Sequence, residues 1–193
     1  MNVNELFESQ LNEARKPTLT YTEKQVKGKV ERLIVTLAGN ESAAMTKLGK
    51  QYKEMQKRLE RVTAVKEELN GRIKSEIVDL YDAEDEVLTR VVETVSITAT
   101  LAKKGTDGPK VDHEKVVAKL LTLMPELQAK IDELTKEFTS VVKAKEPGLT
   151  VKVTEDVAGV WKALKDKFSK LLSSFKTWGK SFDQKLAEIK SAI

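Results

Sequence analysis

The sequence predicts an all-α protein in which long helices pack as an elongated antiparallel bundle or coiled coil. The prediction depends on two apolar stripes whose members recur at alternating steps of three and four residues, which places each stripe on one side of a helix. The first stripe comprises Val117, Leu120, Met124, Leu127, Ile131, Leu134, Phe138 and Val141. The second comprises Val157, Trp161, Leu164, Phe168, Leu171, Phe175, Trp178 and Phe182. Charged residues make up 33% of the 193 residues and aromatic residues 5%, which favours extended helices over a compact mixed fold.

Residues 1–16 are predicted to form an acidic amphipathic leader. Apolar residues recur on one side of a short helix over residues 2–14, and the first thirteen residues contain no Lys or Arg. Lys16-Pro17 ends this helix, because the residue before a proline is pushed out of the helical region of backbone conformation. The acidic residues are Glu5, Glu8 and Glu13.

Residues 17–104 are predicted to hold a short helix followed by a long coiled-coil-like helix. Thr22 and Gln25 have the capping-box pattern at the start of the short helix, and Gly39 is typical of its end. Asn40 or Ser42 can then cap a new helix. No proline occurs from 41 to 102, so this segment can form one helix about 90 Å long. It either stays straight or folds back near Gly71. Its seam comprises Tyr52, Met55, Leu59, Val62, Leu69, Ile73, Leu80 and Val87.

Residues 105–148 are predicted to form a turn and a second seam helix. The segment Gly105–Pro109 is rich in turn-forming residues, and Asp112 can cap the helix that follows. Pro125 interrupts this helix while the apolar stripe stays in phase on both sides, so we expect a kink or a local break there. Glu146-Pro147-Gly148 ends the helix.

Residues 149–193 are predicted to form a linker, up to Val153, and a basic amphipathic helix capped by Thr154. This helix carries half of the aromatic residues of the chain. We assign the packing of the helix, or its binding to a partner, to Trp161, Phe168, Phe175 and Trp178. Lysines occupy its other sides at positions 162, 165, 167, 170, 176, 180, 185 and 190.

The basic helix leaves three interpretations open. Its aromatic stripe can pack on the long helix while the lysines are solvated, which is the favoured interpretation. It can instead lie on an anionic membrane or dock into the groove of a partner. Its lysines can also contact nucleic-acid phosphates, which requires charge rather than a sequence-reading motif.

Chemistry-bearing motifs are scarce, and the sequence predicts no catalytic residue, no metal site and no cofactor site. The chain has no cysteine, and its one histidine, His113, lies beside Asp112 and Glu114 at a predicted helix start. The acidic cluster at residues 79–86 lacks the Glu-x-x-His spacing of helical metal sites. No segment reaches the roughly 20 apolar residues that a membrane-spanning helix needs. We therefore expect a non-enzymatic protein.

The motif Leu11-Asn12-Glu13-Ala14 is the one that points to a function, namely proteolytic processing. It resembles the sites cut by the maturation protease of large contractile-tailed bacteriophages, which favours Leu or Ile, any residue, Glu, and then a small residue. Internal head proteins and prohead core proteins of those phages begin with a short acidic amphipathic leader that is removed after the glutamate. The resemblance, which covers about 14 residues, implies that Leu11 is read by the protease and that the cut falls between Glu13 and Ala14.

The distribution of charge agrees with this resemblance. The whole chain has a formal net charge of +4, and removal of the three glutamates before Ala14 leaves +7. A basic helical protein suits a compartment filled with packed DNA, because binding to DNA releases condensed counterions.

The first hypothesis is therefore a non-enzymatic structural or assembly protein of the phage particle, made in the host cytoplasm and located in the virion. Its expected partners are head and scaffold proteins, with non-specific contact to DNA and self-association as further expectations. The alternative is a cytoplasmic coiled-coil adaptor whose basic C-terminal helix binds a membrane surface or a partner helix. A helical toxin that inserts into membranes is disfavoured, because no hydrophobic hairpin stands out.

Overall fold

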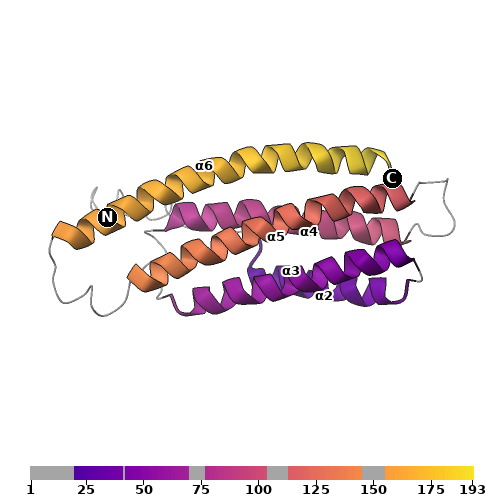
Figure 1. The fold of residues 1–193 in the computed structure, drawn as a ribbon, viewed down its shortest axis with the longest axis horizontal. Coiled ribbons are helices and arrows are strands. Elements are labelled where there is room, and N and C mark those ends of the chain that lie inside the picture. Colours follow the sequence, from indigo (N-terminus) through magenta and orange to yellow (C-terminus); the bar gives the residue numbers. More distant parts are fainter. Residues whose placement is uncertain (1–19, 41, 70–76, 104–112, 145–154) are drawn as a thin grey trace, which may run out of the picture.

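The computed structural model describes residues 20–40, 42–69, 77–103, 113–144 and 155–193, and the side chains of 155–158 and 160 are outside this description. The described residues form helices and contain no strand, which confirms the predicted all-α class. The helices, labelled as in Figure 1, are α2 (Glu23–Ala38), α3 (Ala43–Glu67), α4 (Val78–Lys103), α5 (His113–Ala144) and α6 (Glu155–Ser191).

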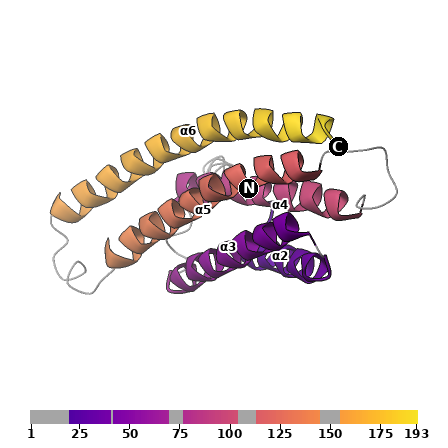
Figure 2. The same cartoon turned by 45° about the vertical axis from the view of Figure 1, so that its right-hand side comes forward.

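The helices lie along one long axis in three layers (Figures 1 and 2). Helices α2 and α3 pack against each other and form one outer layer, and α4 and α5 form the middle layer. Helix α3 also packs on α5, and α2 on α4, so these four helices form a bundle with α6 laid over α4 and α5. Helices that follow one another along the chain run in opposite directions.

The boundaries of α2 are set by the residues that the sequence indicates. The Thr22 hydroxyl accepts from the Gln25 N–H at 3.3 Å, and the Thr22 N–H donates to the Gln25 side chain at 3.0 Å. This reciprocal capping box satisfies two backbone donors at the start of the helix. Gly39 follows the last residue of α2, and Ser42 takes the cap position of α3 without a side-chain cap bond. Asn40 instead accepts from the Ser42 N–H at 3.0 Å.

The single long helix expected over 41–102 is replaced by two helices. Helix α3 ends at Glu67 and α4 begins at Val78, and Gly71 lies outside the described residues. The two helices run antiparallel, since Tyr52 contacts Thr98 at 2.7 Å whereas Lys66, later on α3, contacts Glu84, earlier on α4, also at 2.7 Å. In the folded-back arrangement α3 packs on α2 and α5, and α4 packs on α2, α5 and α6, so the apolar faces of both halves are buried in one bundle.

Helix α5 runs without a break through Pro125, so the alternative of a local break is wrong. A proline inside a helix removes one backbone hydrogen bond and costs about 3 kcal/mol. The residues around it offset this cost, because Met124 and Leu127 are fully buried between neighbouring helices. Tertiary packing therefore outweighs the local preference of the sequence.

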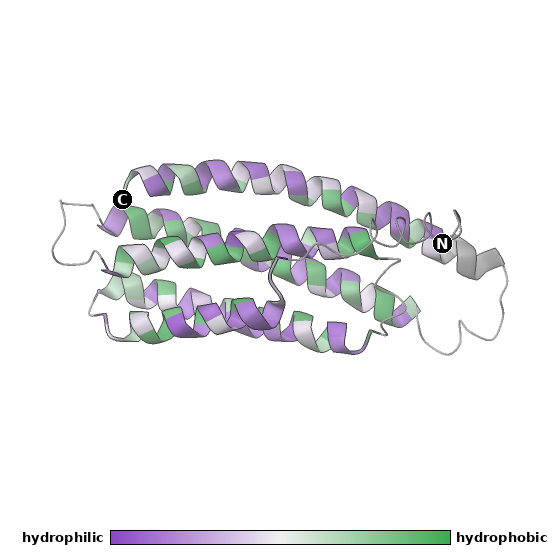
Figure 3. Ribbon diagram, turned by 180° about the vertical axis from the view of Figure 1, so that it is seen from behind, coloured by the Kyte–Doolittle hydropathy of each residue, from purple (hydrophilic) through white to green (hydrophobic). Residues whose placement is uncertain are grey.

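The core is continuous along the bundle. Every member of the stripe from Val117 to Val141 is at most 1% exposed, as the spacing predicts. Hydrophobic and hydrophilic residues alternate along the helices in Figure 3, as expected when each helix buries one side. Among the described residues, Val35 is the large hydrophobic side chain left exposed. The apolar stripes of the helices are therefore buried by contacts with other helices of the same chain.

Candidate interaction site on helix α6

Helix α6 is the outermost element of the bundle and covers the α4–α5 layer (Figure 1). Its inner side is the aromatic stripe that the sequence singled out. Phe168, Phe175 and Phe182 are at most 1% exposed, because they occupy the groove between α4 and α5. The stripe therefore packs inside the chain.

The four residues predicted for packing or partner binding are not equivalent. Phe168 and Phe175 are buried, whereas Trp161 and Trp178 are partly buried against the same core. The Trp178 ring lies 5.1 Å from the Phe182 ring and 6.4 Å from the Phe175 ring, measured between centroids. Its indole nitrogen is buried without an acceptor among the described residues. Phe175 and Trp178 thus belong to one aromatic cluster, and Trp161 lies about four turns earlier on the helix.

Lys130 of α5 joins this aromatic cluster, which the sequence did not indicate. Its ammonium group lies 4.7 Å from the centre of the Phe175 ring and 5.8 Å from that of Trp178. A cation over an aromatic face is attracted by the negative charge density of the ring. Lys130 of α5 therefore contributes a cation–π contact that holds α6 against α5.

Arg90 of α4 fixes the position of α6 along the bundle. Its guanidinium donates to both carboxylate oxygens of Asp183, at 2.8 and 3.2 Å, and also pairs with Glu86 one turn earlier on α4. Burial alone would lower the pKa of Arg90, but the two carboxylates outweigh it and the net shift is upward. The guanidinium lies against Gly179, where α6 has no side chain to displace it.

The outer side of α6 is basic. Five exposed lysines lie on the sides of the helix that face away from the aromatic stripe, with the exposed Asp166 among them. None of the five has a carboxylate within ion-pair distance among the described residues. We call this set the α6 lysine face. It consists of Lys162, Lys165, Lys170, Lys176 and Lys180.

Two further lysines mark the edge of this face toward α5. Lys167 pairs with Glu137 at 2.9 Å, and Lys185 pairs with Glu126 at 2.9 Å. Glu137 is buried, with 5% of its side chain exposed, so its pairing compensates a desolvated charge. These pairs attach the edge of α6 to α5 and leave the α6 lysine face free.

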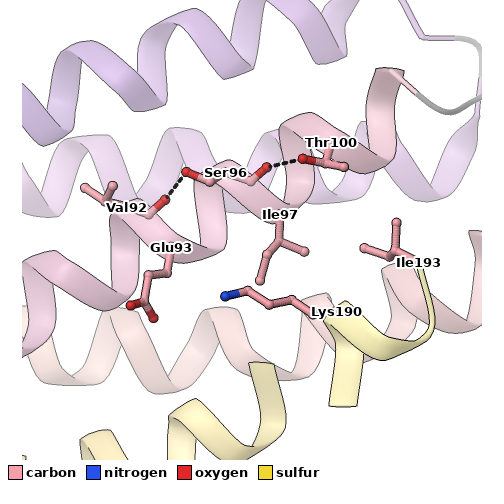
Figure 4. Close-up of a pocket in the computed structure, with 7 residues that line it drawn as sticks. All are labelled: Val92, Glu93, Ser96, Ile97, Thr100, Lys190 and Ile193. Atoms are coloured by element: carbon pink, nitrogen blue, oxygen red, sulfur yellow. Dashed lines mark hydrogen bonds between the residues drawn. The ribbon is translucent and has the colours of Figure 1, made fainter. Parts of the chain in front are cut away.

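A groove of about 370 Å³ lies between the C-terminal ends of α4 and α6 (Figure 4). Val92, Ile97 and Ile193 are its apolar lining residues, and the side chains of Glu93 and Lys190 extend toward one another. The hydroxyls of Ser96 and Thr100 donate to carbonyls of their own helix, at 2.9 and 3.0 Å. Neither hydroxyl is paired with a general base, so the groove does not have the arrangement of a nucleophilic site.

A buried ionic cluster joins α2, α3 and α4 inside the bundle. The Lys66 ammonium lies 2.8 Å from a Glu23 oxygen and 2.7 Å from a Glu84 oxygen. Burial raises the pKa of Glu84 to about 7, which Lys66 only partly counteracts. Burial would lower the pKa of Lys66, but Glu84 and Glu23 reverse the shift. This cluster could not be predicted from a local pattern, because Glu23 and Glu84 are 43 and 18 residues away from Lys66 along the chain.

Two aromatic rings complete the surroundings of Lys66. Its ammonium group is 4.9 Å from the centre of the Tyr81 ring and 5.6 Å from that of Phe138. The Tyr81 hydroxyl is buried and has no hydrogen-bond partner among the described residues. The cluster therefore compensates charge at the junction of four helices, while the Tyr81 hydroxyl and one carboxylate oxygen of Glu84 have no hydrogen-bond partner among the described residues.

The other residues singled out by the sequence lie apart from these features. Leu11, Glu13 and Ala14 are outside the described residues, as are Thr154 and the segment 149–153. His113 is the first residue of α5. Within the described ranges no group of three or more His, Asp or Glu side chains is arranged to hold a metal ion. No described helix is both long and apolar enough to cross a membrane.

Comparison of the chain with protein-family models, with curated proteins and with solved structures finds no match.

Proposed function

We propose that the protein is a non-enzymatic structural or assembly component of a bacteriophage particle, an internal head or prohead core protein processed after Glu13. The observation that carries the proposal is the motif Leu11-Asn12-Glu13-Ala14 at the end of an acidic leader. The proposed partners are head and scaffold proteins, and the proposed location is the virion.

The position of the motif relative to the bundle supports this proposal. Thr20 is the first described residue, and its N–H donates to Asp85 of α4 at 2.9 Å. The six residues 14–19 separate the proposed cut from this anchor. Cleavage after Glu13 would therefore leave the described helices and their contacts in one piece, as a maturation step requires.

The arrangement of α6 weighs against the adaptor alternative in its membrane-binding form. An interfacial helix needs a free apolar face to enter the headgroup region. The apolar face of α6 is buried against α4 and α5, so membrane binding would require α6 to leave the bundle.

Mass spectrometry of the protein from purified mature particles tests the proposal. We expect a chain that begins at Ala14, and we expect Glu13→Gln to leave the leader in place. Glu8→Gln is the matched control, because it removes the same charge from the leader without touching the motif. A full-length chain in mature particles, or absence of the protein from them, would refute the proposal.

A further inference from the structure

A second exposed basic row lies on α3. Its side chains are opposite the buried stripe of that helix, which includes Leu48, Tyr52 and Met55. Glu54 lies among them and pairs with Lys57 at 3.3 Å, a surface pair of small energetic value. We call this set the α3 basic face. It consists of Lys47, Lys50, Lys53, Lys57 and Arg61.

The α3 basic face and the α6 lysine face are on opposite sides of the molecule. Helix α3 buries its apolar side against α2 and α5, and α6 buries its apolar side against α4 and α5. Both views show the α4–α5 layer between α3 and α6 (Figures 1 and 2). Since each basic face is opposite its own buried side, the two faces point away from one another.

The rest of the charge distribution keeps these two faces separate. Helix α3 contains seven Lys or Arg and three Glu, and α6 contains eight Lys and five acidic residues. Helix α4, which lies between them, contains six acidic and two basic residues. Asp82 and Asp85 of α4 are partly exposed. Helix α5, the other helix of this layer, is balanced, with five lysines and five acidic residues. An anionic polymer is therefore attracted to the two outer faces and repelled from the acidic helix α4 between them.

The dimensions of the α6 lysine face fit a nucleic-acid duplex. From Lys162 to Lys180 the helix rises about 27 Å, which matches roughly eight base-pair steps of duplex DNA. Ser169, Ser173 and Thr177 lie between the lysines, and these small side chains allow a phosphate backbone to approach closely. Contacts of this kind depend on charge and carry no base-sequence information.

We propose that the protein bridges two DNA duplexes, one held on the α6 lysine face and the other on the α3 basic face. The inference deepens the proposed function, because a particle interior presents closely packed duplexes. It does not depend on cleavage at Glu13, since both faces lie in the described bundle.

Two other anionic partners fit the surface less well. Anionic membranes favour helices with free apolar residues, whereas Val35 is the large hydrophobic residue that is exposed in the described ranges. Single-stranded nucleic acid is held by stacking of bases on exposed aromatic rings. The aromatic rings of α6 face its buried side, so a duplex backbone is the favoured ligand.

A bead-capture assay with the full chain tests bridging directly. One duplex is fixed to beads, a second fluorescent duplex of unrelated sequence is in solution, and capture is measured with increasing protein. We expect capture at 50 mM salt, followed by loss at high protein, when each duplex is saturated separately. For five phosphate contacts per face, affinity for a single duplex should fall about 500-fold between 50 and 200 mM salt.

Two variants, each lacking five positive charges, distinguish the contribution of one face to DNA binding from that of the other. The first replaces the five residues of the α6 lysine face by Gln, and the second replaces the five residues of the α3 basic face by Gln. Each should still bind a single duplex through its intact face and should lose at least tenfold in duplex capture. Lys119→Gln with Lys136→Gln and Lys143→Gln removes three exposed charges of α5 outside both faces, and it should capture within twofold of the parent.

Circular dichroism and thermal unfolding of each variant verify that the bundle is intact, which is expected because all the replaced residues are exposed. The inference is overturned by absence of duplex binding at 50 mM salt, or by undiminished capture by either single-face variant. It is also overturned by equal loss in the α5 control, or by binding of anionic vesicles in place of DNA. An uncleaved chain in mature particles would refute the processing proposal and leave bridging intact.

Discussion

The guanidinium of Arg90 lies directly against the backbone of α6 at Gly179. A Cβ atom at Gly179 would come within 2.8 Å of the guanidinium carbon, closer than real Cβ contacts. Since the same guanidinium binds Asp183 one turn further along α6, the glycine and the ion pair are parts of one docking contact. The lack of a side chain at Gly179 thus leaves the space that the Arg90 guanidinium occupies.

Gly179→Ala should therefore change stability in a way that depends on Arg90. In a helix interior Ala is favoured over Gly by about 1 kcal/mol. In the wild type this gain is cancelled or reversed, because the new methyl displaces a guanidinium whose charged hydrogen bonds contribute about 1.5–3 kcal/mol. In an Arg90→Ala background the gain should appear in full. Urea unfolding of the four members of this double-mutant cycle measures the coupling, and additive effects would contradict the prediction.

Glu84 should make stability depend on pH between about 5 and 8. Burial raises the pKa of Glu84 from 4.5 to about 7 in the folded protein, with Lys66 acting against the shift and Glu23 reinforcing it. The folded state then holds more protons than the unfolded state in this range. The stabilisation is fully present below pH 4.5 and is lost as pH rises through 7, by up to about 3 kcal/mol.

Glu84→Gln should flatten this part of the stability profile, as measured by urea unfolding at pH 5, 6, 7 and 8. Glu93 is the matched control, because burial also raises its pKa although it is partly exposed at the α4–α6 groove. Glu93→Gln should leave most of the slope in place. A Glu84→Gln profile as steep as that of the wild type would show that another group titrates.

Tyr52 and Tyr81 should respond in opposite ways to loss of their hydroxyls. The Tyr52 hydroxyl lies 2.7 Å from the Thr98 hydroxyl and 3.3 Å from the Thr94 carbonyl, so Tyr52→Phe should destabilise the protein by about 1–2 kcal/mol. The Tyr81 hydroxyl is buried without a partner among the described residues, so Tyr81→Phe should be neutral or stabilising by up to about 1 kcal/mol. Equal losses of stability in the two variants would show that Tyr81 has a partner.

Truncation of the aromatic stripe should cost more at its centre than at its start. Phe175 is fully buried, and Phe175→Ala should destabilise the protein by about 3–5 kcal/mol through a cavity beneath α6. Trp161 is partly exposed, and Trp161→Ala should cost about 1–2 kcal/mol. Lys165→Ala on the outer face, as control, should change stability by less than about 0.5 kcal/mol. A larger loss for Trp161 than for Phe175 would mean that α6 is docked mainly by its first turns.

Much of the fold could be predicted because helix periodicity is a local property. The stripe of α5, the capping box at Thr22 and the end of α2 at Gly39 all follow from residues within one or two turns. The separation of α3 from α4 could not be fixed in the same way. The seam residues on both sides of Gly71 are compatible with one straight helix, and the choice depends on which arrangement covers more apolar surface.

The contacts that dock α6 could not be predicted from the sequence, for a different reason. Arg90 and Asp183 are 93 residues apart, and no local pattern distinguishes Lys130 from the other lysines of the chain. Their roles depend on the register of α6 against α4 and α5, which no single helix encodes. The burial of Phe168 and Phe175 was predictable, and so was packing of the stripe on the long 41–102 segment, to which α4 belongs. The contact of α6 with α5 was not predicted.

The position of α6 as the outer layer has a consequence for how the chain is made. Helices α2 to α5 leave the ribosome first and already contact one another, so this bundle can collapse while the last 37-residue helix is still being translated. During that interval the apolar surface that later covers Phe168 and Phe175 is exposed to water, and the nascent chain is prone to aggregation. Closure of the hydrophobic interior therefore has to wait until α6 has left the ribosome and docked on α4 and α5.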